Sequence, residues 1–223
     1  MKYINIAIDG PAGAGKSSIS KIVSKRLGFI YIDTGAMYRS VALFAIENGI
    51  DIKNETSKLI SVLDSINIDM KYENDKQIIL LNGRDVSDDI RKAEVSIGAS
   101  DVAVIKEVRL KLVELQRKLA SNNNVVMDGR DIGTYVLPDA QIKIYLTASV
   151  EDRAKRRYDE MVQKGMECDI EKVKLDIMYR DKNDSEREFA PLRKADDATV
   201  IDTSGNEFEE SVELLYNFIK ERL

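Results

Sequence analysis

The residues Ile4-Asn5-Ile6-Ala7-Ile8-Asp9, followed by Gly10-Pro11-Ala12-Gly13-Ala14-Gly15-Lys16-Ser17, decide how the rest of the chain is interpreted. The second part follows the pattern G-x-x-x-x-G-K-S, which is typical of a phosphate-binding loop. The β-branched residues before the loop predict a buried strand. After the loop, apolar residues recur at helical spacing, namely Ile19, Ile22, Val23 and Leu27. Strand, glycine-rich loop and helix is the order that this motif requires.

Phosphate binding by such a loop has a specific physical basis. Glycines let the backbone N–H groups converge on one anion, and the following helix adds the positive end of its dipole. Lys16 is predicted to reach the β- and γ-phosphates of a nucleotide, and the Ser17 hydroxyl to bind Mg²⁺. We therefore predict a donor-nucleotide site formed by Gly10, Pro11, Ala12, Gly13, Ala14, Gly15, Lys16, Ser17 and Ser18, with Ser17 as the metal ligand.

Composition narrows the chemistry. The 223 residues carry a net charge of −5, which gives no bulk attraction to nucleic acid or to an anionic membrane. No apolar run approaches the ~20 residues that span a bilayer, and the first residues lack a signal-peptide pattern. We therefore expect a soluble, cytoplasmic protein, and a monomer. Cys168 is the only cysteine and histidine is absent, which excludes Ser-His or Cys-His nucleophile pairs within the chain. Catalysis must then use backbone amides, Lys, Arg, Asp and a metal ion.

Further strands and helices alternate along the chain. Short apolar runs at 29–32, 125–127, 140–146 and 198–202 predict strands, and residues 91–120 predict one or two helices. An antiparallel segment interrupts this order at 66–72 and 77–81, with a turn at Asn74-Asp75. Asn82-Gly83 predicts a hairpin turn before a third strand at 84–86. The chain is therefore predicted to be an α/β protein with a small antiparallel insertion.

Charged residues follow several of these predicted elements. The strand at 125–127 ends in Asp128-Gly129-Arg130-Asp131, and a P-loop protein places such an acid beside its Mg²⁺. Ligands of open α/β sheets bind at this strand edge. The pattern does not decide whether Asp128 contacts the metal directly. Arg153, Arg156 and Arg157 share one face of a predicted helix. Taken alone, the strand-end acid is a weak signal and the arginine-rich helix is better explained as a solvated surface helix.

The loop, followed about twenty residues later by Asp33-Thr34-Gly35-Ala36-Met37-Tyr38-Arg39, resembles the bacterial cytidylate kinases, which are P-loop nucleoside monophosphate kinases. The resemblance covers essentially the whole chain. It implies a P-loop NTPase three-layer α/β fold with a central parallel sheet, a small antiparallel β insertion and a helical lid. It further implies a core of residues 1–33, 95–150 and 171–223, and a lid at 151–170. The acceptor-binding region would be 34–94, with the β insertion at about 64–90.

The same resemblance implies the reaction and the site. ATP and Mg²⁺ would phosphorylate CMP and dCMP, with Lys16, Asp128, Arg130, Arg153 and Arg157 as catalytic residues. Arg153 and Arg157 would close over the donor triphosphate. The acceptor would contact Thr34, Gly35, Tyr38, Arg39, Ser100, Arg109, Arg130, Asp131, Arg180, Asp184 and Arg187. Within that set, Arg39, Arg130 and Arg180 would bind phosphate, Ser100, Arg109 and Asp131 the cytosine, and Asp184 and Arg187 the ribose. The loop Thr203-Ser204-Gly205-Asn206 would lie near the adenine of the donor.

A monophosphate acceptor suits a chain without histidine, since its second pKa lies near 6 and it needs no general base at neutral pH. The alternatives are another small-molecule kinase of the same fold, acting on UMP, AMP or a metabolite hydroxyl, a GTP-binding switch, and a nucleotide-binding module without activity. The Asn-Lys-x-Asp motif of guanine recognition is absent from the sequence, and the intact lysine and arginine set argues against an inactive module.

Overall fold

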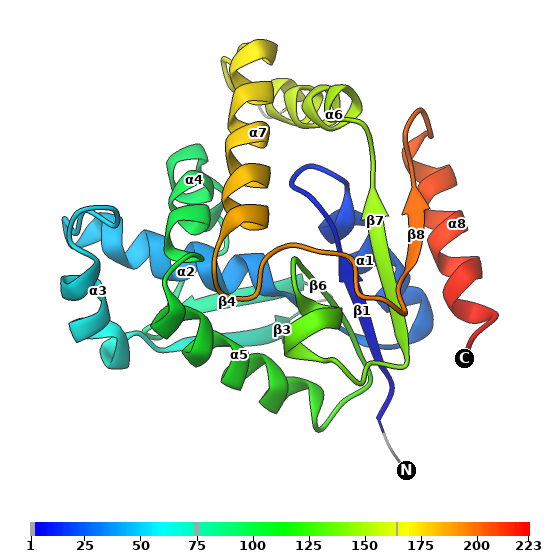
Figure 1. Ribbon diagram of the computed structural model, residues 1–223, viewed down its shortest axis with the longest axis horizontal. Helices are drawn as coiled ribbons and strands as arrows, with labels where there is room; N and C mark the ends of the chain where they lie inside the picture. The colour runs from blue at the N-terminus through cyan, green and yellow to red at the C-terminus, as the bar shows by residue number, and fades with distance from the viewer. Residues whose placement is uncertain (1–2, 74–75, 164) are drawn as a thin grey trace. The chain divides into compact units, whose positions relative to one another are not determined.

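The computed structural model describes residues 3–73, 76–163 and 165–223. It contains two compact units, which are described separately. The first combines the residues up to Asp33 with Gln116–Leu223, and the second is Thr34–Leu115 (Figure 1).

The first unit is built on a five-stranded parallel sheet of order β2-β6-β1-β7-β8. The strands are β1 (Asn5–Asp9), β2 (Ile30–Asp33), β6 (Val125–Gly129), β7 (Ile142–Thr147) and β8 (Thr199–Asp202). In the register of the sheet, Asp9 lies opposite Gly129 and Asp33 opposite Asp128. The carboxyl ends of three adjacent strands therefore meet at one edge, directly beside the glycine-rich loop.

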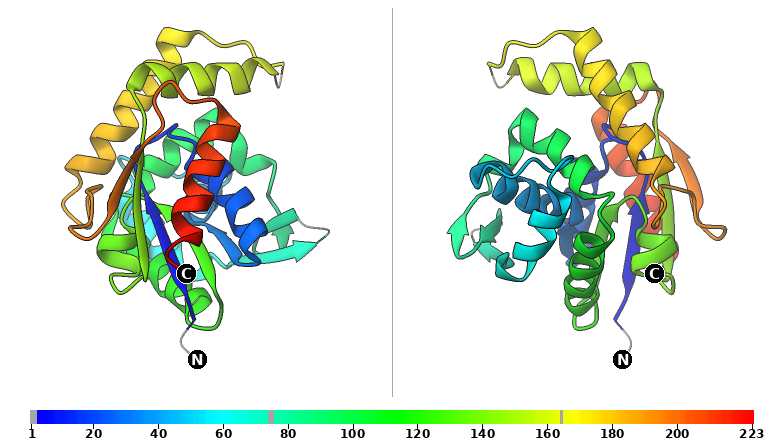
Figure 2. Two further views of the ribbon diagram at one scale, coloured as in Figure 1. Left: turned by 90° about the vertical axis from the view of Figure 1, so that its right-hand side faces the viewer. Right: turned by 60° about the vertical axis from the view of Figure 1, so that its left-hand side comes forward.

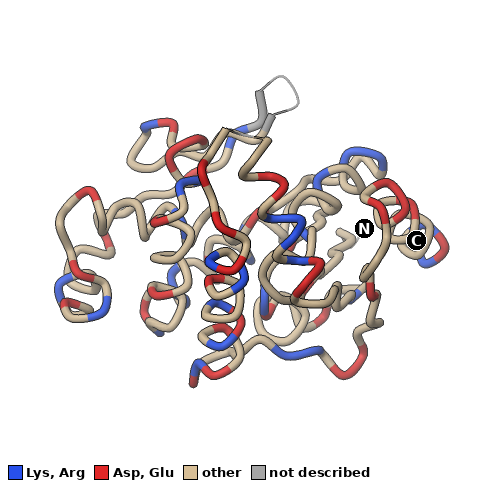
Figure 3. Tube along the Cα trace, turned by 90° about the horizontal axis from the view of Figure 1, so that it is seen from above, with Lys and Arg blue, Asp and Glu red and all other residues tan. Residues whose placement is uncertain are grey.

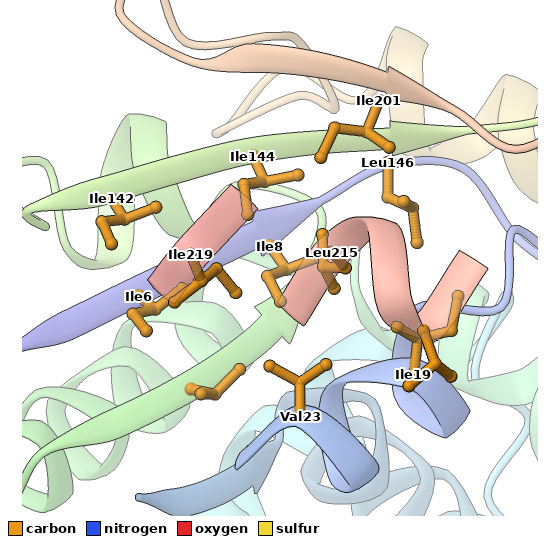
Figure 4. Close-up of a cluster of buried hydrophobic side chains, with 12 residues drawn as sticks. Ile6, Ile8, Ile19, Val23, Ile142, Ile144, Leu146, Ile201, Leu215 and Ile219 are labelled. Atoms are coloured by element: carbon orange, nitrogen blue, oxygen red, sulfur yellow. The ribbon is translucent and has the colours of Figure 1, made fainter. Parts of the chain in front are cut away.

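The core of the first unit lies between this sheet and helices α1 (Lys16–Leu27) and α8 (Phe208–Lys220). Ile6, Ile8 and Ile144 from the sheet pack against Val23 of α1 and Leu215 of α8 (Figure 4). All five are almost completely excluded from solvent. The apolar residues that recur at helical spacing in the sequence thus face the sheet. Their burial stabilises the strand–loop–helix unit.

Two helices of the first unit follow β7 in the chain. They are α6 (Val150–Gln163) and α7 (Ile170–Glu186), and they pack on each other through Ala154, Val173 and Ile177 (Figures 1 and 2). Cys168 lies partly buried beside this small cluster. The carboxylate of Asp169 caps α7 by accepting the backbone N–H of Glu171 at 2.7 Å.

The second unit contains the antiparallel insertion. Its three strands, in the order β3-β4-β5, are β3 (Ile68–Glu73), β4 (Lys76–Leu81) and β5 (Arg84–Asp85). Asn82 and Gly83 have φ angles of 50° and 82°, so the predicted two-residue hairpin turn is confirmed. The turn predicted at Asn74-Asp75 lies outside the described residues. The parallel sheet and the antiparallel insertion together confirm the predicted fold class.

Helices make up the rest of the second unit. They are α2 (Thr34–Glu47), α3 (Thr56–Val62), α4 (Ala93–Val102) and the first part of α5 (Lys106–Ala120), with short 3₁₀ turns at Leu63–Ser65 and Asp89–Arg91. Residues 91–120 were predicted to form one or two helices, and they form two. Because α4 packs along α2, with Gly98 against Ala42, the unit extends to Leu115 rather than ending near residue 94.

Candidate active site

The glycine-rich loop joins β1 to α1 with a backbone that only glycine can adopt at one position. Gly10 has φ of 150°, and a Cβ there would overlap the carbonyl oxygen of Leu146 in β7. The helix N-cap is Gly15, which has no side chain to bind the first amides of α1. These N–H groups, together with the positive end of the helix dipole, are therefore available to an anion.

Lys16 is the only lysine of the loop, and its side chain is buried near charged groups of both signs. It is 5% exposed, and its Nζ donates a hydrogen bond to the carbonyl oxygen of Pro11 at 2.6 Å. Burial and the positive charges of Arg130 and Arg180 lower the pKa of Lys16 well below its usual value, although Asp128 and Asp184 oppose them. The negative charge of a bound polyphosphate would favour the protonated form of this buried lysine.

Asp128, at the end of β6, is held by two hydroxyl groups. Ser17 Oγ donates to its Oδ2 and Tyr31 Oη donates to its Oδ1, both at 2.8 Å. Burial and the nearby charge of Asp33 raise the pKa of Asp128 to about 6. Burial and the same two carboxylates raise the pKa of Tyr31 well above 10, so that its phenol remains a donor.

The residues around Asp128 fit Mg²⁺. Ser17, Asp33 and Asp128 offer only oxygen atoms, which this hard cation prefers, and a cation would relieve the repulsion between the two acids. In the described part of the chain, no cluster of three or more His, Cys, Asp or Glu residues could hold a metal ion by itself. This donor set therefore suits a Mg²⁺ that keeps water ligands and binds together with nucleotide phosphates.

Asp9 is a buried carboxyl group that the sequence analysis did not include in the site. It accepts the backbone N–H groups of Ile132 and Gly133, both at 2.7 Å. These amides belong to a π-helical turn, η3 (Ile132–Val136), which directly follows Asp131. Burial raises the pKa of Asp9 to about 7. The signal was present in the sequence, since Asp9 ends an apolar strand in the same way as Asp128.

Four charged residues predicted to bind the acceptor form one buried network. Arg130 Nε donates to Asp184 Oδ2 at 2.6 Å, and Arg187 Nη2 donates to Asp131 Oδ1 at 3.2 Å. Arg187 also lies 3.7 Å from Asp184. Burial alone would raise the pKa of Asp184, but Arg130, Arg187 and Arg180 hold it below its ordinary value. Asp184 therefore remains a carboxylate that orients the guanidinium groups around it.

The arginines of α6 differ sharply in their surroundings. The Arg153 side chain is 5% exposed, and its Nη1 donates to the carbonyl oxygen of Ala12 at 2.8 Å and to Asp181. Arg157 is 29% exposed and pairs with Glu160 on its own helix at 2.8 Å. Arg156 donates to the carbonyl oxygens of Thr203 and Asn206, which anchors the loop 203–206 to α6.

The remaining predicted acceptor residues lie in the second unit. Thr34, Gly35, Tyr38 and Arg39 belong to the first turns of α2, Ser100 to α4 and Arg109 to α5. The Arg109 guanidinium lies over the Tyr38 ring, 5.5 Å from its centroid, and donates to the carbonyl oxygen of Ala103. Ser100 is 5% exposed, and its hydroxyl has no hydrogen-bond partner among the described residues. A buried polar atom in this state is stabilised by a polar ligand.

A parallel sheet whose first strand runs into this loop, with acids at the adjacent strand ends, defines the chain as a P-loop kinase. The model of the cytidylate kinase family matches residues 6–221. A cytidylate kinase of Caldicellulosiruptor saccharolyticus is 54% identical, covering 98% of each chain. One from Bacillus cytotoxicus is 50% identical, covering 100% of this chain and 98% of its own. The chain belongs to the cytidylate kinase family, and it is a phosphotransferase enzyme.

A solved structure of an uncharacterized protein from Eubacterium ventriosum shares the fold, with a TM-score of 0.54 at 14% sequence identity. The match covers 99% of this chain and 100% of that chain. In the described part of the chain, no helix has the length and apolar character that crossing a membrane requires.

Proposed function

We propose that the protein transfers the γ-phosphoryl group of ATP to CMP and dCMP, which gives ADP and CDP or dCDP, with Mg²⁺ as the metal ion. Membership of the cytidylate kinase family supports the reaction. The observation that carries the proposal is the position of Lys16, Asp128 and Arg130 at the carboxyl edge of the parallel sheet. There, the buried Lys16 and the partly buried Arg130 lie beside the N-terminus of α1, whose N-cap Gly15 provides no side-chain cap.

The mechanism needs positioning and charge neutralisation rather than a general base. The acceptor phosphate is already an anionic nucleophile near neutral pH, so the enzyme must hold two anions in line. Lys16 and the backbone amides at the start of α1 bind the donor phosphates. Ser17 would hold the Mg²⁺, with Asp128, which accepts the Ser17 hydroxyl, shaping the site around it; when bound, the metal ion would neutralise charge on the phosphate oxygens. Arg130 and Arg180 receive the acceptor phosphate, and Arg153 and Arg157 stabilise charge on the transferred group.

The acceptor base and sugar are assigned to residues of both units. In the second unit, Ser100 and Arg109 contact the cytosine, and Thr34, Gly35, Tyr38 and Arg39 complete the acceptor contacts. In the first unit, Asp131 accepts from the cytosine amino group, while Asp184 and Arg187 bind the ribose hydroxyls. The unpartnered Ser100 hydroxyl and the salt-bridged carboxylates of Asp131 and Asp184 support these roles.

Residues 151–170 are proposed to act as a lid over the donor. Water competes with the acceptor for the phosphoryl group, and a closing segment excludes it. The loop 203–206, anchored by Arg156, is proposed to lie near the donor adenine. The protein is further proposed to be a cytoplasmic monomer. Lys and Arg are interspersed with Asp and Glu along the chain (Figure 3), and the net charge of −5 gives no bulk attraction to nucleic acid.

The test is an ADP-release assay with ATP and Mg²⁺ against CMP, dCMP, UMP, AMP and GMP, with an acceptor-free reaction as the background. We expect turnover to favour CMP and dCMP strongly. Preference for AMP or GMP would preserve the P-loop mechanism but contradict the base contacts of Ser100, Arg109 and Asp131. An absence of turnover with every monophosphate would point to a hydroxyl acceptor instead.

A further inference from the structure

Asp181, in α7, links the phosphate-binding loop to two helices of the first unit, and neither the motif nor the proposed mechanism uses it. Its Oδ1 accepts the backbone N–H of Ala12 at 2.9 Å. Its Oδ2 accepts a hydrogen bond from Arg153 Nη1 at 2.5 Å. The same Nη1 donates to the carbonyl oxygen of Ala12 at 2.8 Å. Ala12, Arg153 and Asp181 therefore close a ring of hydrogen bonds around one residue of the loop.

The ring is shielded from solvent, which makes its bonds strong and costly to break. Ala12 is 1% exposed, and the side chains of Arg153 and Asp181 are 5% and 23% exposed. Arg153 Nε also donates to the carbonyl oxygen of Ala148, which fixes the guanidinium at the start of α6. Removing the carboxylate would leave the Arg153 charge buried without its partner.

Packing ties the neighbouring loop residue to the same two helices. A Cβ at Gly13 would lie 3.2 Å from Arg153 Cβ and 3.3 Å from Ile177 Cδ1. Ile177 belongs to the apolar contact between α6 and α7. Two consecutive loop residues, Ala12 and Gly13, thus contact the helices that carry Arg157 and Arg180.

We propose that Asp181 is a positioning residue for phosphoryl transfer, which sets the peptide groups of Ala12 and holds Arg153 against the loop. The inference rests on the proposed kinase function. Consecutive helical residues point about 100° apart, so Asp181 can bind the loop while Arg180, directly before it, serves the acceptor phosphate. The loop binds the donor phosphates, and α7 carries residues that bind the acceptor. The Asp181 carboxylate therefore fixes the donor-binding loop relative to the acceptor-binding residues of α7.

Asp181→Asn is the sharpest test, since asparagine can still accept from the Ala12 N–H but offers Arg153 no negative charge. Misplacement of a reacting group by about 1 Å costs about 100-fold in rate. We therefore expect kcat to fall about 100-fold with little change in KM for CMP, and ADP to bind about 10-fold more weakly by titration calorimetry. Asp176→Asn, at an exposed position of the same helix, is the matched control and should behave as wild type.

A double variant tests whether Arg153 and Asp181 act as one hydrogen-bonded unit or through two independent contacts. If Arg153 and Asp181 act together, Arg153→Met combined with Asp181→Asn should lose little more activity than the worse single variant. Additive losses would overturn the inference. Unchanged kcat and ADP affinity in a protein that is merely less heat-stable would assign Asp181 to stability alone and also overturn it. Tighter ADP binding would show that Asp181 acts by repelling phosphate, which contradicts positioning.

The ADP titration also separates this inference from the proposed function. It requires no acceptor and no turnover, so it reports on the loop even if wild-type protein fails to phosphorylate CMP. Wild-type protein without CMP turnover would reject the proposed substrate. Wild-type turnover with unchanged kinetics and ADP binding in Asp181→Asn would reject the positioning role.

Discussion

Two carboxyl groups at the ends of neighbouring strands show how strongly the surroundings of a single residue determine its chemistry. Asp128 is held by the hydroxyls of Ser17 and Tyr31, whereas Asp9 is held by two backbone N–H groups. Burial raises the pKa of both, to about 6 for Asp128 and about 7 for Asp9. Asp128 lies beside Lys16 of the loop and suits a metal site, whereas Asp9 stabilises the π-helical turn that follows Asp131.

Asp9 should make the stability of the protein depend on pH. Its folded-state pKa of about 7 lies above the ordinary value of 3.8, so the native state keeps a proton that the unfolded chain loses. Its contribution to the free energy of unfolding is therefore greatest below about pH 4 and is lost as the pH rises towards 7. Urea unfolding between pH 5 and 8 should show this decline, and Asp9→Asn should flatten it.

The control for this experiment is Asp139→Asn, which changes an exposed aspartate in a loop of the same unit. It should keep the wild-type pH profile. Parallel pH profiles for wild type and Asp9→Asn would contradict the role given to burial at this carboxyl.

Ser100 offers a second prediction at the scale of one atom. In the described structure its buried hydroxyl has no hydrogen-bond partner, so Ser100→Ala should leave the free protein as stable as before, or slightly more stable. Loss of one hydrogen bond to the cytosine should raise KM for CMP by about 2- to 10-fold. Thermal unfolding and steady-state kinetics on the same preparations measure both effects.

Ser96→Ala is the matched control on the same helix, because the Ser96 hydroxyl already donates to the carbonyl oxygen of Lys92 at 3.2 Å. It should leave KM for CMP unchanged. An unaltered KM in Ser100→Ala would remove that residue from the acceptor site.

At the scale of single elements, helix α6 carries two arginines in different surroundings: Arg153 is buried and hydrogen-bonded, and Arg157 is partly exposed. Arg153 is bound to the loop, whereas Arg157 pairs with Glu160 at the surface of the helix, a contact that costs little to break. Arg157→Ala should lower kcat by about 100-fold, as loss of a preorganised charge donor does, and weaken ATP binding much less. Single-turnover and steady-state assays distinguish the two parameters.

The comparison for Arg157 is Lys155→Ala, which removes a charge from an exposed position of the same helix. It should retain wild-type kcat. Equal kcat for wild type and Arg157→Ala would exclude Arg157 from the transfer step.

Elements set by local sequence were predictable, and elements set by distant contacts were not. The strand–loop–helix unit and the Asn82-Gly83 turn depend on residues adjacent in the chain, so their patterns indicate them directly. The turn η3 depends on Asp9, which accepts its first amides, and on Arg117, which donates to the carbonyl oxygens of Tyr135 and Val136. No pattern within residues 132–136 encodes those partners.

The same distinction applies to the site. Phosphate-binding residues could be proposed from the motif and from the family resemblance, because the residue types are specific to the chemistry. The contact between Ala12 and Asp181 joins positions 169 residues apart, and only the packing of α6 and α7 on the loop reveals it. Sequence reasoning therefore identified candidate ligands, but it could not identify the side chains that hold them.

At the scale of the whole molecule, the second unit is an insertion between two parts of the first. The parallel sheet is assembled from strands on both sides of Thr34–Leu115 in the chain. The insertion combines a helical layer with its own antiparallel sheet, and it carries six of the predicted acceptor residues.

The sheet order β2-β6-β1-β7-β8 has a consequence for folding during synthesis on the ribosome. Strand β1 lies at the centre of the sheet, yet both of its neighbours, β6 and β7, are translated more than a hundred residues later. The nascent β1 strand therefore emerges from the ribosome without its pairing partners. Before those partners are made, all of Thr34–Leu115 has been synthesised and can form its own internal contacts. The inserted unit should consequently acquire protease resistance first on stalled ribosomes, and the surrounding nucleotide-binding unit should follow only after residue 147 has left the exit tunnel.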